Sequence, residues 1–98
     1  MPITITAQDN VTRISISDRF DYSIHTEFRS AYKDTPKGTE FIIDLGKASY
    51  MDSSALGMLL LLRERIGEDG PTISIVGCTS EIRKILEISN FGTLFNIS

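Results

Sequence analysis

The feature that most constrains the fold is a change in the spacing of apolar residues along the chain. Two early runs, Ile3–Thr6 and Val11–Ser17, are rich in β-branched residues and alternate apolar with polar side chains, which predicts strands. Asp9-Asn10 between them is typical of a tight turn. The sequence therefore begins with a predicted antiparallel β-hairpin.

After the hairpin, helix-like and strand-like segments alternate. The predicted order is a helix from Ser23, a strand at Phe41–Leu45, a helix at Ser54–Ile66, a strand at Thr72–Gly77, a helix capped by Thr79 or Ser80, and a strand at Thr93–Ile97. Phe41–Leu45 is mostly apolar, as in a strand buried on both faces, and we expect loops at 18–22 and 46–52. Strands that alternate with helices predict an α/β fold. We expect a small mixed, mostly parallel sheet with packed helices.

The length and composition limit what such a fold can do. The 98 residues suit one domain spanning residues 1–98, and a net charge of -3 with scattered basic residues disfavours nucleic-acid binding. One cysteine and one histidine exclude an internal disulfide and argue against a metal centre of thiolates and imidazoles, and we expect no cofactor. No signal peptide is visible, and the longest apolar run, Met58–Leu62, is too short to span a membrane. We therefore expect a cytoplasmic protein.

Candidates for catalysis are few. His25 has no evident nucleophile partner, and Cys78 follows a predicted strand, so we expect an exposed helical histidine and a half-buried structural cysteine. Four carboxylates fall at or near predicted strand ends, namely Asp18, Asp21, Asp44 and Asp52. Loop and capping roles are the simpler interpretation, and an acidic Mg²⁺ pocket is the alternative. We expect no enzyme.

The most specific local pattern is Met51–Gly57, which joins a loop to a helix. Within it, Asp52, Ser53 and Ser54 are three consecutive residues that can each cap a helix N-terminus, although one is enough. A surplus serine there is a chemically sensible phosphorylation site, because the first turn of a helix favours an anion. Spacing alone leaves both roles open, a plain helix cap and a phosphorylation switch.

The helix that follows this pattern is apolar on all sides. Met58–Leu62 places large apolar side chains around the whole axis. Such a helix is either packed in the core with a leucine or two exposed, or it presents an apolar face to a partner. Both possibilities remain open at this point.

Three places in the sequence resemble the STAS domain of bacterial anti-sigma-factor antagonists. They are Arg19-Phe20-Asp21, the stretch from Phe41 to Gly57 that includes Asp52-Ser53-Ser54, and Ile85–Phe91. The Asp-Ser-Ser motif is the specific one, and together the three span nearly the whole chain. The departures are Asp18 and Ala55, which stand where the family usually or often has glycine.

The resemblance implies a function. In the family, the first serine of Asp-Ser-Ser is phosphorylated by a serine kinase of the histidine-kinase-like ATPase fold, which also acts as an anti-sigma factor, and a PP2C-type phosphatase reverses the modification. Ser53 corresponds to the phosphorylated serine. The resemblance thus implies a partner-switching regulator of transcription or signalling that binds its partner when Ser53 is unmodified. The expected partner-binding residues are Asp21, Asp52, Ser54, Leu56 and Met58.

Two other classes of function remain as alternatives. One is a receiver-like phosphoacceptor with an acidic Mg²⁺ pocket, although the chain has fewer βα units than a receiver needs, and no lysine directly follows the strand predicted at Thr72–Val76. The other is a constitutive protein-interaction scaffold without a switch. The acid stability of the phosphorylated group would separate serine from aspartate chemistry.

Overall fold

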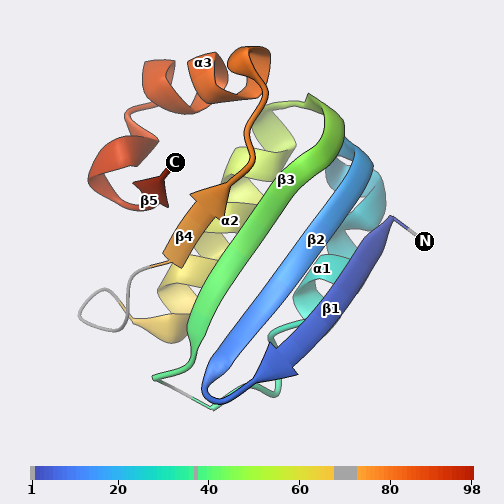
Figure 1. Cartoon of the computed structure of the whole chain (residues 1–98), viewed down its shortest axis with the longest axis vertical. Coiled ribbons are helices and arrows are strands. Elements are labelled where there is room, and N and C mark those ends of the chain that lie inside the picture. The colour runs from blue at the N-terminus through green and yellow to red at the C-terminus, as the bar shows by residue number, and fades with distance from the viewer. Residues whose placement is uncertain (1, 37, 68–72) are drawn as a thin grey trace.

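The structure is a computed structural model that describes residues 2–36, 38–67 and 73–98. Its centre is a five-stranded sheet in the order β1-β2-β3-β4-β5 (Figure 1). The strands are β1 (Ile3–Gln8), β2 (Val11–Phe20), β3 (Glu40–Met51), β4 (Ile73–Val76) and β5 (Asn96–Ile97). Only the β1–β2 pair is antiparallel. The prediction of a mixed, mostly parallel sheet that begins with a hairpin is confirmed.

The hairpin turn has the backbone that its residues predict. Asp9 and Asn10 have φ values of 53° and 57°, so both central residues of the turn are left-handed. A two-residue turn of this kind matches the twist of an antiparallel pair, and Asp and Asn tolerate it best among residues with a side chain.

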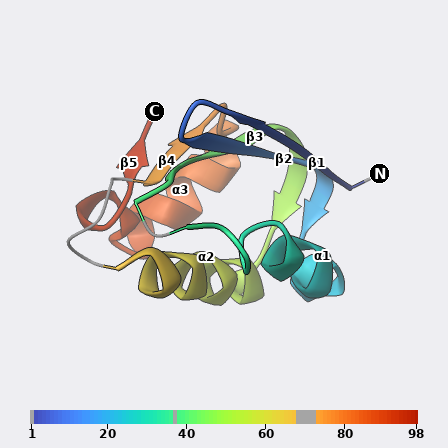
Figure 2. The ribbon, with the colours of Figure 1, turned by 90° about the horizontal axis from the view of Figure 1, so that it is seen from below.

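The helices are α1 (His25–Ser30), α2 (Ser53–Ile66) and α3 (Ser80–Ile88), with short 3₁₀ turns at Tyr22–Ile24 (η1) and Phe91–Thr93 (η2). Figure 2 shows α1 and α2 side by side beneath one face of the sheet. Their buried side chains meet the inward residues of the strands in one apolar core. Among the described residues, no helix is long and apolar enough to cross a membrane.

Several predicted strand boundaries were wrong. Residues 18–20 and 46–51 were expected in loops, yet β2 runs to Phe20 and β3 to Met51. The regular alternation of side chains is lost there because the pairing of β3 with β2 is irregular at two places. On β2 these places lie between Ser15 and Ser17 and between Asp18 and Arg19. The last strand was expected at Thr93–Ile97, but Thr93 lies in η2 and only Asn96–Ile97 pair with β4.

The β3 strand is buried on one face, not on both as predicted. Phe41, Ile43 and Leu45 are at most 2% exposed, whereas Ile42 and Asp44 on the other face are only half-buried. The helices therefore leave the second face of the sheet partly open. Asp44 lies on this open face, where Arg13 Nη2 donates to Asp44 Oδ2 over 2.8 Å.

Gly77, directly after β4, cannot be replaced without strain. Its φ is +74°, and a Cβ atom there would lie 2.9 Å from the backbone nitrogen of Gly46. The close approach of these two glycines brings the chain leaving β4 against β3. By contrast, Gly57 lies inside α2 with open space where its side chain would stand.

We therefore expect opposite effects from two glycine-to-alanine changes. Gly77→Ala should lower the free energy of unfolding by ~2 kcal/mol or more, because it combines a left-handed backbone with a clash. Gly57→Ala should raise it by ~0.5–1 kcal/mol, because alanine is the better helix former. Urea unfolding of both variants measures this. A neutral Gly77→Ala would contradict the close approach of β4 to β3.

Candidate functional site

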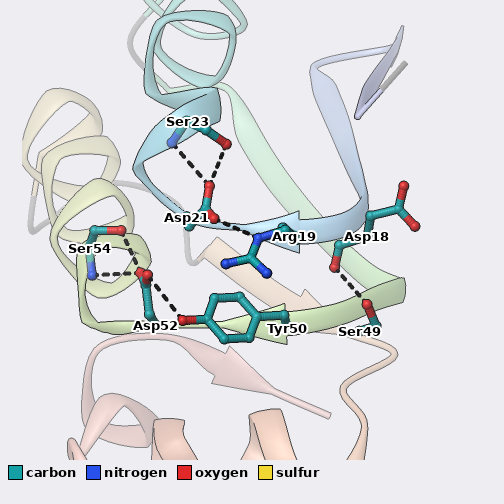
Figure 3. Close-up of polar contacts among 8 residues, drawn as sticks. All are labelled: Asp18, Arg19, Asp21, Ser23, Ser49, Tyr50, Asp52 and Ser54. Carbon is teal, nitrogen blue, oxygen red and sulfur yellow. Dashed lines mark hydrogen bonds and ion pairs between the residues drawn. The ribbon is translucent and has the colours of Figure 1, made fainter.

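The candidate site lies where two neighbouring parallel strands end. Phe20 and Met51 are paired residues at the ends of β2 and β3, so the next residues of the two strands, Asp21 and Asp52, start two helical segments side by side. Figure 3 shows the polar side chains gathered there. We call this group the strand-end cluster, and its members are Arg19, Asp21, Ser23, Tyr50, Asp52 and Ser54.

Asp52 is the N-cap of α2. Its Oδ1 accepts the backbone N–H of Ser54 over 3.0 Å and also the Ser54 hydroxyl (Figure 3). Of the three residues that could each cap the helix, the structure assigns the cap to Asp52, and Ser54 is a donor to it. The α2 helix also begins at Ser53 and not at Ser54.

Ser53 is the serine left over. It is the first residue of α2, its side chain is exposed, and no hydrogen bond among the described residues uses its hydroxyl. The cap thus occupies Asp52 and Ser54 and leaves the Ser53 hydroxyl open to solvent.

Asp21 repeats the same cap one strand away. Its Oδ1 accepts the backbone N–H of Ser23 over 3.0 Å and also the Ser23 hydroxyl. Ser23 is thus a donor to the cap, and the helix predicted from Ser23 begins instead as η1 at Tyr22 and continues as α1 from His25. The spacing that could have revealed both caps is Asp-x-Ser, which occurs at Asp21-Tyr22-Ser23 and again at Asp52-Ser53-Ser54.

Arg19 and Tyr50 connect the two caps, and the sequence did not single either out as a site residue. They are paired residues of β2 and β3. Arg19 Nε donates to Asp21 Oδ2 over 2.9 Å, and the guanidinium carbon lies 4.1 Å from the centre of the Tyr50 ring. The Tyr50 hydroxyl in turn lies 3.5 Å from Asp52 Oδ2. A basic residue beside a cap, opposite an aromatic residue on the next strand, was visible only once the register was known.

The hydrogen bonds hold both capping carboxylates in the charged form. Donation from Ser54 lowers the pKa of Asp52 below its ordinary value, although burial and the nearby Asp21 charge oppose this. Donation from Ser23 and then from Arg19 lowers the pKa of Asp21 in the same way. At neutral pH the cluster therefore carries two carboxylates and one guanidinium.

The other predicted partner-binding residues are less accessible. Leu56 is half-buried against the core, and Met58 is only 6% exposed. On the same helix, Leu60 and Leu61 are 41% and 58% exposed. The apolar character of α2 thus has two origins, because most of its large side chains fill the core and two stand on the surface.

The four strand-end carboxylates do not converge. Asp44 pairs with Arg13 on the open face of the sheet, whereas Asp21 and Asp52 serve separate caps. Asp18 is exposed, with a φ of 65°. The described residues include no group of three or more His, Cys, Asp or Glu side chains placed to hold a metal. The predicted capping roles hold for Asp21 and Asp52, whereas Asp18 and Asp44 lie within β2 and β3 and not in loops.

The backbone at Asp18 explains one departure from the family pattern. Its left-handed φ is a conformation that glycine adopts freely and that aspartate tolerates better than most residues. Ser49 of β3 donates to the Asp18 carbonyl over 3.1 Å and ties the irregular stretch to its neighbour (Figure 3). Ala55, the other departure, is fully buried in α2.

His25 and Cys78, the two residues considered for catalysis, both lie in surroundings typical of structural residues. His25 is half-buried rather than exposed as predicted. Its ring stacks on Tyr22 at 3.9 Å, and its Nδ1 lies 2.8 Å from the Tyr22 carbonyl oxygen. Cys78 is half-buried as expected, and burial raises the pKa of its thiol, which makes it less reactive.

Comparison with known proteins identifies the family. The family model described as "Mlab, STAS domain" matches residues 3–96. The chain is also 51% identical to the STAS-domain containing protein PA14_20770 of Pseudomonas aeruginosa (strain UCBPP-PA14), over 87% of this chain and 85% of that protein. The chain therefore belongs to the STAS domain family.

Solved structures share the fold at low sequence identity. An anti-sigma-factor antagonist (STAS) domain protein from Planctomyces limnophilus superposes with a TM-score of 0.84 at 19% identity, over 98% of this chain and 87% of that one. The Bacillus cell fate determinant SpoIIAA in its phosphorylated form superposes with a TM-score of 0.69 at 16% identity, over 98% and 90%. The five-stranded, mostly parallel architecture is thus the STAS fold.

The cap geometry predicts that Asp52 stabilises the fold, that Ser53 does not, and that the contribution of Asp52 depends on pH. Asp52→Ala should lower the melting temperature, because two donors lose their acceptor. Ser53→Ala should leave it nearly unchanged. Since the folded-state pKa of Asp52 is depressed, its charge-dependent contribution is present above the ordinary value of 3.8 and is lost as the pH falls through the folded-state pKa.

Melting curves between about pH 6 and pH 2 measure this directly. The melting-temperature gap between wild type and Asp52→Ala should be full near pH 6 and should narrow below pH 3.8. Asp34→Ala, which removes an exposed carboxylate outside both caps, is the matched control. A gap that stayed constant with pH, or an equal gap for Asp34→Ala, would contradict the cap.

Proposed function

We propose that this chain is a phosphorylation-controlled partner-switching regulator of the anti-sigma-factor antagonist type. Unmodified, it binds a cognate serine kinase that also serves as an anti-sigma factor, of the histidine-kinase-like ATPase fold. Phosphorylation of Ser53 ends this binding, and a PP2C-type phosphatase restores it. The domain, spanning residues 1–98, is the substrate of these enzymes and catalyses nothing itself, and its place of action is the cytoplasm.

One observation supports this proposal above the others. Within Asp52-Ser53-Ser54, the cap occupies the first and third residues, and the middle hydroxyl is exposed and makes no hydrogen bond to any residue that the structure describes. A kinase can reach such a hydroxyl without opening the helix. The first turn of α2 also offers backbone N–H groups and the positive end of the helix dipole, which stabilise an added anion by ~0.3–2 kcal/mol.

The surroundings of Ser53 suit a protein interface. Tyr50 is 39% exposed and lies over Arg19, and Tyr22, beside Asp21, is 63% exposed. Tyrosine and arginine are enriched among the residues that dominate binding energy. Asp21, Asp52, Ser54 and Leu56 belong to the proposed surface through their positions around Ser53. Met58 is left out because its side chain is buried.

The receiver-like alternative does not fit the sheet. A receiver is doubly wound, with strands in the order 2-1-3-4-5, whereas this sheet runs β1-β2-β3-β4-β5 with an antiparallel β1. A constitutive scaffold remains the competing hypothesis. It predicts that phosphate at Ser53 would leave partner binding unchanged.

Phosphate on Ser53 should abolish partner binding without unfolding the domain. An uncompensated charge in an interface typically costs ~2–5 kcal/mol, which is roughly 30- to 4,000-fold in affinity. Ser53→Asp should reproduce part of this loss, and Ser53→Ala should bind permanently. Titration calorimetry against the partner captured with Ser53→Ala as bait measures the affinities, and melting curves of the same samples check the fold.

Ser80 provides a matched control. It is exposed and is the first residue of α3, directly after the cap Thr79, so it holds the same helix position as Ser53 but is not adjacent in sequence to members of the strand-end cluster. Ser80→Asp should leave the affinity unchanged. Equal binding by the phosphorylated and unmodified proteins, or weak binding explained by melting alone, would refute the switch.

A further inference from the structure

The strand-end cluster has a net negative charge, and a phosphate on Ser53 would add to it. Asp21 and Asp52 are close enough that the Asp21 charge opposes ionisation of Asp52. A phosphoserine next to Asp52 adds a charge of about -1.5 to -2 at neutral pH. The helix dipole offsets only part of this repulsion, so a cation within reach would further stabilise a modified Ser53.

Arg19 is the one cationic member of the cluster. Its guanidinium lies over the Tyr50 ring, and the Tyr50 hydroxyl touches Asp52, the residue directly before Ser53. Figure 3 shows the guanidinium between Asp21 and the Tyr50–Asp52 pair. The hydrogen bond to Asp21 is the main cause that raises the pKa of Arg19, and the charge of Asp52 adds a smaller contribution in the same direction.

The guanidinium also has donors to spare. Its hydrogen bond to Asp21 uses Nε, and no hydrogen bond among the described residues uses the two Nη groups. Its side chain is 61% exposed, so it can move without unpacking the core. Paired N–H groups of arginine match phosphate oxygens, and such charge-assisted bonds are about twice as strong as neutral ones.

We propose that Arg19 is the counter-charge of the Ser53 phosphoryl group and binds it through its Nη groups. This inference rests on the proposed phosphorylation of Ser53 and names the residue that receives the phosphate. In the unmodified protein Arg19 lies across Tyr50 as part of the exposed surface. In the modified protein it turns to the phosphate, so that the partner loses an arginine contact as well as meeting a new dianion.

The test uses protein with phosphoserine inserted at position 53 during translation, so it needs no kinase. The second pKa of the phosphoserine, near 6 when unperturbed, is followed by ³¹P NMR titration at physiological salt. A neighbouring cation favours the dianion, so this pKa should be ~0.3–1 unit lower in the wild type than in Arg19→Gln. Arg19→Lys, which keeps the charge and loses the paired N–H groups, should fall between them.

Arg13→Gln is the matched control. It removes the same charge from the same strand, six residues earlier or about 20 Å away along β2, which is beyond the reach of exposed charges at this salt concentration. It should leave the phosphoserine pKa at the wild-type value. In the wild type, the Arg19 Nε–H resonance should also shift on phosphorylation, a readout that requires no variant to fold.

The outcomes separate this inference from the proposed function. An equal phosphoserine pKa in the wild type and Arg19→Gln, an equal rise in Arg13→Gln and Arg19→Gln, or an unmoved Arg19 resonance would overturn the role of Arg19. None of these results depends on whether a partner is released. Conversely, a phosphoserine pKa that depends on Arg19, together with unchanged partner affinity, would support the counter-charge and refute the switch.

Discussion

The parallel pairing of β2 with β3 is the constraint on which the site depends. Both strands are long, and their register places Phe20 beside Met51 at the edge where the chain turns down into helices. Because the two buried side chains fix the strand ends, Asp21 and Asp52 must begin their helical segments next to each other. A slip of one residue would turn these side chains to the opposite face. The register of β2 with β3 therefore determines which charged side chains meet in the strand-end cluster.

At this edge, the helix cap and the proposed phosphorylation use different atoms. The carboxylate of Asp52 and the backbone and hydroxyl of Ser54 form the cap, and the hydroxyl of Ser53 stays outside it. The proposed phosphate falls on a hydroxyl that no hydrogen bond among the described residues uses, so its addition breaks none of the cap hydrogen bonds. The same cap at Asp21 carries Tyr22 in the position of Ser53. Two similar caps thus present one exposed hydroxyl and one exposed aromatic ring.

The sequence predicted the order and type of the main elements, because apolar spacing distinguishes strands from helices, although it did not reveal that β3 is buried on one face only. It failed where that spacing is interrupted. The irregular pairing around Ser49 and Tyr50 hid the second half of β3, and the left-handed Asp18 hid the end of β2. The Asp-Ser-Ser motif marked Ser53, but which residue caps is a matter of hydrogen-bond geometry. The role of Arg19 could not be predicted because it depends on Tyr50 of the neighbouring strand, which only the β2–β3 register places beside it.

The central claim is that the cap leaves Ser53 as the residue open to phosphorylation. Phosphopeptide mapping of the protein isolated from its native cells, with intact-mass measurement of the same sample, tests this most directly. We predict a single acid-stable phosphate on Ser53, and its loss in Ser53→Ala but not in Ser80→Ala. A phosphate on Ser54, on an aspartate, or on no residue under any growth condition would contradict the claim.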